Sequence, residues 1–223
     1  MTPSPGPIPW WVIVPVKGAP AGKSRLDGAY SDRAALSRAI ALDTLEAVAG
    51  ALPADRIVLV CSDAAIVKYG EGRGFVCVPD PATGLNAAIR HADSAIGARE
   101  RQLPHDPDEI PTAVAALLGD LPSLRPQDLV DALTLAASYD RAFVPDRDGT
   151  GTVLLTDRTG TLHPRFGEGS AERHEKSGYL RLDLDLPHLR TDVDTAADLA
   201  IALQLGCGAK LATILADHSS VPR

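Results

Sequence analysis

The chain has 223 residues, and with 45% hydrophobic and 23% charged residues it is long enough to bury a sizeable core. Its formal net charge of −7 argues against a general nucleic-acid or membrane surface, because phosphate groups repel such a protein at long range. Cys61, Cys77 and Cys207 match no metal-ligand spacing and predict free thiols in a reducing compartment. Since the N-terminus lacks the features of a signal peptide and no apolar run reaches membrane-spanning length, we expect a soluble cytoplasmic protein.

Short β-rich runs alternate with helical patterns along the chain. Strands are predicted over residues 11–17, 56–62, 74–80, 112–120, 141–146 and 152–157. Helices are predicted over residues 32–52, 84–96, from about 127 onward and over 194–206. The polar segment 97–111 is expected to be an exposed loop. Continuous apolar strands separated by helices predict an α/β fold with a mostly parallel sheet that helices cover on both faces.

The chain is predicted to form one domain. No internal repeat and no linker divides residues 1–223, and residues 1–10 are interpreted as a loose leader. Residues 147–186 are expected to elaborate one edge of the sheet. In such sheets ligands gather at the carboxyl ends of the strands, so the residues that follow each strand are the first candidates for chemistry.

Two glycines and three cations follow the first predicted strand. Three residues separate Gly18 from Gly22, whereas a P-loop needs four there, and a proline among the three removes a backbone donor. The P-loop interpretation therefore fails on spacing. Lys17, Lys23 and Arg25 predict instead a loop that binds a triphosphate through side-chain charge, with a solvated basic loop as the plainer alternative.

Asp80 follows the third predicted strand and precedes a Gly-Leu-Asn turn into a helix. Such a turn places an amide donor and acceptor beside free helix N–H groups, which suits the recognition of a base or ribose. Asn86 could equally be an ordinary residue at a helix start.

Three aspartates are candidate metal ligands. Asp120 ends the fourth predicted strand, where a carboxylate is costly unless it is hydrogen-bonded or bound to a cation, and capping of the following turn is an equal alternative. Asp192 and Asp194 share a face if their short segment is extended, and Asp194 or Thr195 is expected to cap the last predicted helix. Carboxylates at strand ends beside a triphosphate suit Mg²⁺, which completes its coordination shell with phosphates and water.

A glycine-rich span after the fifth predicted strand predicts an anion pocket. Its donors are Arg147, Thr150, Thr152, Arg165, Ser170, Arg173 and His174. Arginine and hydroxyl groups, together with backbone amides freed by glycine, suit phosphate and carboxylate. The alternative is a surface hairpin with ordinary charges. Because no nucleophile pattern lies nearby, His163 and His174 are interpreted as substrate contacts or surface residues and not as catalytic bases.

Six motifs in their order along the chain resemble one nucleotidyltransferase family. They are "VIVPVK…GKSRL", "PDPATGLNAAI", "GDLP", "VPDRDGTGT", "HPRFGEGSAERH" and "DVDTAADL". The family is that of the 2-phospho-L-lactate and phosphoenolpyruvate guanylyltransferases of coenzyme F-420 biosynthesis, and the resemblance extends from about residue 11 to residue 206. The form "GTGT" resembles the actinobacterial branch, which implies phosphoenolpyruvate as the acceptor, whereas many other relatives carry "DGGTN" here.

The resemblance implies a glycosyltransferase-A-like, Rossmann-like nucleotidyltransferase fold with a seven-stranded mixed sheet. It also implies four sets of site residues. The GTP phosphates would be bound by Lys17, Lys23 and Arg25, which with Asp120 are the expected catalytic residues. The guanosine would lie beside Asp80, Leu85 and Asn86. The Mg²⁺ ion would be held by Asp120 and Asp192, with Asp194 as a further candidate. The phosphoenolpyruvate would be bound by Thr152, Gly167 and Ser170, with Arg147 and Arg165 as further candidates from the anion pocket.

Other functions stay open at this point. The nearest is a guanylyltransferase for 2-phospho-L-lactate or another phospho-acid, or a nucleotidyltransferase that acts on molybdopterin or a sugar phosphate. A GTP-binding module without chemistry is the alternative from another class, although the strand-end aspartates argue against it. The expected partners are the two small substrates, with no nucleic acid and no membrane, and a downstream transferase is a candidate recipient of the product.

Overall fold

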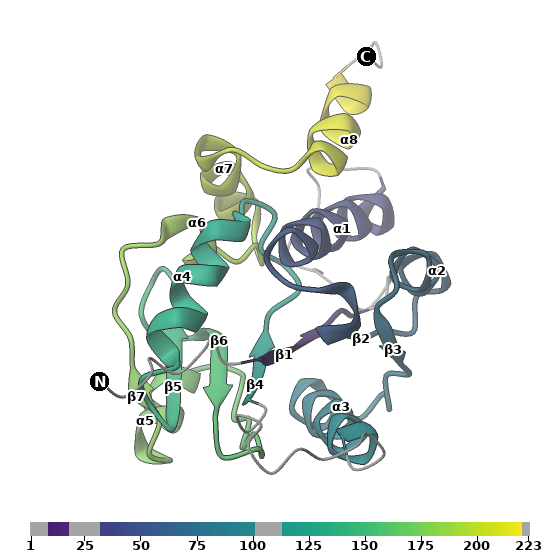
Figure 1. Cartoon of the computed structure of the whole chain (residues 1–223). Helices are drawn as coiled ribbons and strands as arrows, with labels where there is room; N and C mark the ends of the chain where they lie inside the picture. The colour runs from purple at the N-terminus through teal and green to yellow at the C-terminus, as the bar shows by residue number, and fades with distance from the viewer. Residues whose placement is uncertain (1–8, 18–31, 101–112, 220–223) are drawn as a thin grey trace, which may run out of the picture.

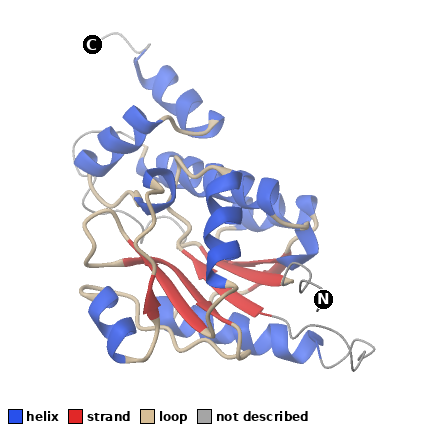
Figure 2. Ribbon diagram, turned by 60° about the vertical axis from the view of Figure 1, so that its left-hand side comes forward, coloured by secondary structure: helices blue, strands red, loops and turns tan. Residues whose placement is uncertain are grey.

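The computed structural model describes residues 9–17, 32–100 and 113–219 of the chain. Within these ranges a seven-stranded mixed sheet lies between layers of helices (Figure 1, Figure 2). The strands are β1 (Trp10–Pro15), β2 (Ile57–Val60), β3 (Val76–Val78), β4 (Ala113–Leu117), β5 (Arg141–Pro145), β6 (Thr152–Asp157) and β7 (Leu180–Arg181). The α-helices are α1 (Arg33–Ala51), α2 (Ala64–Arg73), α3 (Leu85–Glu100), α4 (Pro126–Ala136), α5 (Ser170–Lys176), α6 (Pro187–Arg190), α7 (Ala196–Leu205) and α8 (Ala209–Ser219).

The strand order β3-β2-β1-β4-β6-β5-β7 places a topological switch between β1 and β4. Strands β1 to β4 run parallel, whereas β6 is antiparallel to both β4 and β5. Because of this reversal, the start of β6 lies at the same edge of the sheet as the ends of β1, β4 and β5. The fold class predicted from the sequence is confirmed, including the mixed sheet that the family resemblance implied.

Successive residues of β1 face opposite sides of the sheet and fill two separate cores. Val12 packs in one cluster with Leu45 of α1 and Leu129 of α4. Ile13 packs in the other cluster with Ile89 of α3. Figure 1 shows α1 and α4 on one side of the sheet and α3 on the other. Since helices cover both faces, β1 is apolar along its whole length.

A third cluster joins α1 to the C-terminal helices. Leu36 of α1 packs with Val193 and with Leu211 of α8. The buried carboxylate of Asp43 accepts the backbone N–H of Leu211 and that of the residue before it, both at 2.9 Å, and so fixes the start of α8. The packing of Val193 holds the neighbouring Asp192 close to α1. No single helix in the described ranges is long and apolar enough to cross a membrane. Helices α7 and α8 reach that length and apolar composition only when they are counted together, and the chain bends by 118° between them.

The predicted elements are confirmed with local differences. The segment 97–111 was expected to be a loop, but α3 continues to Glu100, so this expectation is wrong for residues 97–100. The carboxylate of Glu100 accepts a 2.6 Å hydrogen bond from Trp11 and a 3.1 Å one from Arg56, which hold this last turn in place. Helices α2, α5, α6 and α8 and the two-residue β7 were not predicted.

Gly119 allows the end of β4 to approach the end of β1. A Cβ atom at this position would lie 2.7 Å from the carbonyl oxygen of Pro15 and 2.9 Å from Cγ2 of Val16. We expect Gly119→Ala to lower the free energy of unfolding by about 1–3 kcal/mol, because the backbone at one strand end must move. Urea unfolding measures this change.

Gly72→Ala is the matched control for this substitution. Gly72 lies inside α2, and an added Cβ atom there meets nothing within 4 Å. This change should raise the free energy of unfolding by about 0.5–1 kcal/mol, because alanine loses less backbone entropy in a helix. A destabilisation of equal size at both positions would contradict the contact assigned to Gly119.

Candidate active site

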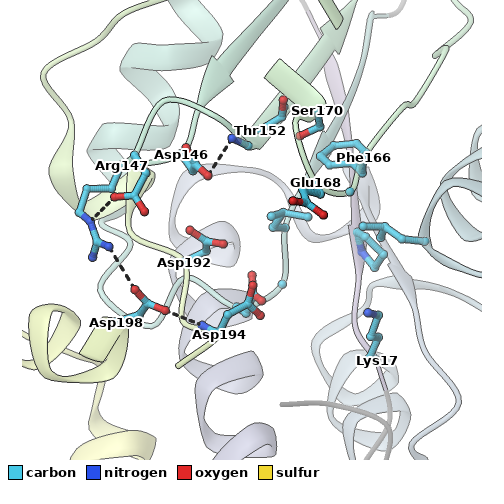
Figure 3. A pocket seen from close by; sticks show the side chains of 18 of the residues that line it. Lys17, Asp146, Arg147, Thr152, Phe166, Glu168, Ser170, Asp192, Asp194 and Asp198 are labelled. Carbon is cyan, nitrogen blue, oxygen red and sulfur yellow. Dashed lines mark hydrogen bonds and ion pairs between the residues drawn. The ribbon is translucent and has the colours of Figure 1, made fainter. Parts of the chain in front are cut away.

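A cavity of about 660 Å³ opens at the edge of the sheet where β1, β4 and β5 end and β6 begins (Figure 3). Acidic residues outnumber basic ones by seven to two in the described part of its wall. The acidic residues are Asp120, Asp146, Asp148, Glu168, Asp192, Asp194 and Asp198, and the basic ones are Lys17 and Arg147. Such an excess of carboxylates repels anions, so an anionic substrate here needs cations beside it.

A backbone hydrogen bond joins the two predicted metal-binding segments. Val193 donates its N–H to the carbonyl oxygen of Asp120 at 3.1 Å, so Asp192 and Asp194 flank the residue that is bonded to Asp120. All three carboxylates line the cavity. In the part of the chain that the structure describes, no three His, Cys, Asp or Glu side chains form a closed metal site. Mg²⁺ does not require one, because it binds through one or two carboxylates and completes its shell with phosphates and water.

Thr44 of α1 fixes the turn that follows Asp120. Its Oγ1 accepts the backbone N–H of Leu121 at 2.9 Å and donates to the carbonyl oxygen of Ile40 at 3.0 Å. Thr44 is fully buried, so this hydrogen bond is shielded from water. The position of Asp120 is therefore set from two sides, by α1 and by the segment that carries Asp192.

The carboxyl of Asp192 lies in surroundings that disfavour its charged form. Burial, together with the negative charges of Asp120 and Asp194, raises its pKa to about 7. A carboxylate in such surroundings is stabilised by a proton or by a cation. The carboxylate oxygens are hard ligands of the kind that Mg²⁺ prefers, so the residues present fit this ion.

Thr195 and Asp198 cap α7 as a reciprocal pair. The Thr195 side chain accepts the Asp198 N–H, and the Asp198 carboxylate accepts the Thr195 N–H at 2.9 Å. Of the two predicted caps, Thr195 is confirmed and Asp194 is not used. Arg147 donates to Asp198 and to Asp148, each at 3.1 Å. This arginine therefore lines the cavity as predicted, but two carboxylates already pair with it.

Asp146 organises the loop between β5 and β6. Its carboxylate accepts the backbone N–H of Thr150 at 3.0 Å and that of Gly151 at 2.8 Å, as Figure 3 shows in part. The guanidinium of Arg190 donates to the carbonyl oxygen of Asp146 at 2.9 Å from the other side. These contacts fix the loop and so determine the position of Thr152, the first residue of β6, in the cavity wall.

The predicted acceptor-binding residues come together in one part of the wall. Thr152 and Ser170 both line the cavity, although they are only 3% and 2% exposed. Gly167 has a φ of 120°, a conformation that glycine adopts far more readily than other residues, and its carbonyl oxygen accepts the Ser170 N–H at 3.0 Å. Figure 3 shows Thr152 and Ser170 close together.

The side chain of Asn86 makes a contact that the sequence did not suggest. Its amide donates to the carbonyl oxygen of Phe166 at 3.0 Å and accepts the Phe166 N–H at 2.8 Å. Asp80 accepts the Ala82 N–H at 2.9 Å. Leu85 lines the cavity, whereas Asp80 and Asn86 are not among the described residues of its wall. Contacts of Asp80 and Asn86 with guanosine stay predictions.

The predicted phosphate-binding cations are only partly placed. Lys17 lines the cavity directly after β1. Lys23 and Arg25 lie outside the described residues. Arg165 is exposed and does not belong to the described wall, although its neighbour Phe166 does. The expected contact of Arg165 with substrate therefore gains no support from its position.

Five polar residues of the described wall were given no role from the sequence. They are Ser37, Asp146, Asp148, Glu168 and Asp198. Asp146 directly follows β5, so the strand-end rule that selected Asp120 could have selected it as well. Nothing in the sequence distinguishes the face of α1 that presents Ser37 to the cavity from the faces that pack in the core.

His174 is neither a surface residue nor a described part of the cavity wall, so the interpretation from the sequence is wrong. The residue is fully buried and is 0% exposed. Its ring packs against the three aromatic rings of Phe143, Phe166 and Tyr179, with centroids 5.8, 5.3 and 5.7 Å away. Its nitrogens hydrogen-bond with Thr152 at 2.9 Å and with the Arg165 N–H at 3.0 Å. His174 therefore lies behind the wall that contains Thr152.

Burial, together with the positive charges of Arg173 and Arg165, lowers the pKa of His174 to about 4. Its ordinary pKa is 6.5, so between pH 4 and 6.5 the unfolded chain binds more protons than the folded chain at this residue. Stability contributed by the neutral ring is therefore lost as the pH falls through this window. Between pH 7 and pH 4 we expect the wild type to lose about 2–3 kcal/mol more unfolding free energy than His174→Gln. Urea unfolding at several pH values measures the difference, and parallel curves would contradict it.

Comparison with known proteins identifies the family. The family model described as "Guanylyl transferase CofC like" matches residues 10–216. A phosphoenolpyruvate guanylyltransferase of Salinispora arenicola is 43% identical over 211 residues, which are 92% of each chain. An enzyme of the same name from Streptomyces coelicolor is 41% identical over 216 residues, which cover 93% of this chain and 96% of the relative.

Solved structures show the same fold at lower identity. A protein of Desulfovibrio desulfuricans G20 described as a nucleotide-diphospho-sugar transferase has a TM-score of 0.66, with 20% identity over 95% of each chain. A Mycobacterium tuberculosis H37Rv protein solved in complex with manganese has a TM-score of 0.52 and 21% identity, covering 88% of this chain and 98% of that one. These structures show the fold, and the family model and the relatives above 40% identity show the family. The chain belongs to the family of CofC-like guanylyl transferases.

Proposed function

We propose that this guanylyl transferase moves GMP from GTP to phosphoenolpyruvate, giving enolpyruvyl-diphospho-5′-guanosine and pyrophosphate. The observation that supports it most is that one cavity contains candidate residues for both substrates. Thr152, Gly167 and Ser170 line the same cavity as Lys17 and the strand-end residue Asp120. In this proposal a site for a small phospho-acid and a site for a triphosphate are adjacent. Relatives more than 40% identical over nine-tenths of the chain carry the corresponding name.

We propose Mg²⁺ as the metal, held by Asp120 and Asp192 with Asp194 as a further ligand. The hard oxygen donors and the raised pKa of Asp192 support this assignment. The excess of carboxylates in the wall supports it as well, because two anionic substrates must approach each other there. When bound, the ion would offset the negative charge of the triphosphate.

The reaction is an in-line displacement at phosphorus. An oxygen of the phosphoenolpyruvate phosphate forms a bond to the α-phosphorus of GTP, the bond from that phosphorus to the bridging oxygen breaks, and pyrophosphate leaves with the electron pair. The attacking phosphate is already ionised near neutral pH, so no general base is needed. In this proposal Lys17, Lys23 and Arg25 hold the triphosphate, while Thr152 and Ser170 orient the acceptor.

We further propose that residues 1–223 act as one domain in the cytoplasm, in coenzyme F-420 biosynthesis. The free thiols of Cys61 and Cys77 suit a reducing compartment. The product contains a reactive mixed diphosphate, so a downstream transferase is the proposed recipient.

Pyrophosphate release tests the proposed function. The assay contains the protein, Mg²⁺ and GTP with phosphoenolpyruvate, with 2-phospho-L-lactate or with no acceptor, and ATP replaces GTP in a parallel series. We expect release only with GTP and phosphoenolpyruvate. Release with 2-phospho-L-lactate alone would change the acceptor, and GTP binding without release with any acceptor would indicate a non-catalytic module.

A further inference from the structure

The buried ring of His174 makes two hydrogen bonds whose directions can be assigned. The backbone N–H of Arg165 can only donate, and it lies 3.0 Å from Nε2, so Nε2 accepts and carries no proton. A neutral imidazole then carries its proton on Nδ1. Nδ1 lies 2.9 Å from Oγ1 of Thr152, so the ring donates to this hydroxyl oxygen.

This assignment determines what the Thr152 hydroxyl can do. A hydroxyl has one hydrogen to donate, and when its oxygen already accepts from a ring N–H that hydrogen is directed to another acceptor. The described residues offer Oγ1 of Thr152 no second partner, and Thr152 lines the cavity. The hydroxyl hydrogen is therefore available to a ligand oxygen in the cavity.

We propose that His174 is a positioning residue that fixes Thr152 as a hydrogen-bond donor to the anionic acceptor substrate. The proposal rests on the proposed function, because it takes the ligand oxygen to belong to the phospho-acid. Without the ring N–H, the threonine hydroxyl could turn and present its lone pairs, which repel a phosphate or carboxylate oxygen. The ring is held in this role by its full burial, since the neutral form is favoured there.

The second nitrogen of the same ring holds the neighbouring segment. Its hydrogen bond to the Arg165 N–H fixes the chain just before Phe166, which Asn86 fixes from the other side. These two functions of the ring can be separated by substitution. In His174→Gln the side-chain amide can reach the position of Nε2 and accept from Arg165, but it has no donor at the position of Nδ1. In His174→Asn the amide can donate to Thr152 but cannot reach Arg165.

The first test is the tautomer of His174, because it does not depend on activity. Long-range ¹H–¹⁵N correlation spectra of the full chain at pH 7.5 distinguish an Nδ1–H ring from an Nε2–H ring. The signals of His174 are those that disappear in His174→Gln. We expect the Nδ1–H tautomer. An Nε2–H or doubly protonated ring would overturn the proposal.

The second test is a double-mutant cycle on the KM for phosphoenolpyruvate in the pyrophosphate-release assay. Thr152→Val should raise this KM about 10-fold, since a hydrogen bond to a charged group is lost, and His174→Gln should raise it about 5-fold. The double variant should be no worse than Thr152→Val alone, because His174 acts through that hydroxyl. His174→Asn should show a smaller increase than His174→Gln, and the KM for GTP should change less than about 2-fold throughout. The control His91→Gln, at an exposed position on α3, should leave both values unchanged.

The outcomes separate the two proposals. Multiplicative effects of Thr152→Val and His174→Gln would overturn the positioning role, because the two residues would then act independently. If the wild type released no pyrophosphate with phosphoenolpyruvate, the proposed function would fail. In that case the tautomer alone tests the hydrogen bond from His174 to Thr152. An Nδ1–H ring would support this hydrogen bond, and an Nε2–H ring would contradict it.

Discussion

Asp120→Asn is expected to lower kcat for pyrophosphate release by a factor of about 10² or more, as the loss of other electrostatic stabilisers does. The substitution keeps the size of the side chain and removes its charge. Two hydrogen bonds hold the turn independently of that charge: the Val193 N–H donates to the carbonyl oxygen of Asp120, and the Leu121 N–H donates to Oγ1 of Thr44. The loss should therefore appear in kcat without any loss of folding stability, which circular dichroism and thermal unfolding verify.

Asp131→Asn is the control for this prediction. Asp131 is exposed on α4 and accepts a hydrogen bond from Gln127 at 2.7 Å, so its substitution removes one negative charge without touching the cavity. It should change kcat less than about 2-fold, as exposed charges far from a site usually do. If Asp120→Asn retained full activity at saturating Mg²⁺, the metal-binding role of Asp120 would be wrong.

The fold could be predicted largely because strong local signals agree with it. The first strand is apolar at every position, and this is typical of a strand buried on both faces. Elements without such a signal were missed. Helix α2 contains Gly70 and Gly72, which weaken its helical pattern, and β7 has only two residues and exists through its pairing with β5. Such elements depend on tertiary contacts that no short window of sequence contains.

The site could be predicted as far as the strand-end rule reaches. It selected Lys17 and Asp120, and the structure places both in the cavity wall. The contact of Asn86 with Phe166 joins residues 80 positions apart, and no local pattern indicates it. His174 lies in a stretch rich in polar residues, so its burial among aromatic rings from other elements could not be inferred. The residues of the cavity wall were therefore easier to predict than those that hold the wall in place.

Asp192→Asn is expected to make the metal-free protein more stable while removing its activity. Burial and the charges of Asp120 and Asp194 raise the pKa of Asp192 to about 7, against 3.8 in the unfolded chain. The folded state thus binds more protons between about pH 4 and 7, so this residue lowers stability as the pH rises through that window, and the full cost is present above it. At pH 8 in EDTA, Asp192→Asn should gain about 1–2 kcal/mol of unfolding free energy and about 2–8 °C in Tm.

Added Mg²⁺ with GTP should reverse this order, because a ligand that binds only the folded state stabilises it by mass action. The wild type should gain about 2–3 kcal/mol at a hundredfold excess over Kd, whereas Asp192→Asn should gain much less because it has lost a metal ligand. Asp194→Asn is the comparison variant: Asp194 is exposed and repels Asp192 only as a neighbour, so its removal should raise metal-free stability less than Asp192→Asn does. Thermal unfolding in EDTA and in Mg²⁺ with GTP measures all three proteins. Two results would show that the carboxylate is structural: a metal-free Asp192→Asn that is less stable than the wild type, or an Asp192→Asn that gains as much stability from Mg²⁺ with GTP as the wild type does. A cation-binding site instead requires a carboxylate whose negative charge lowers the stability of the metal-free protein.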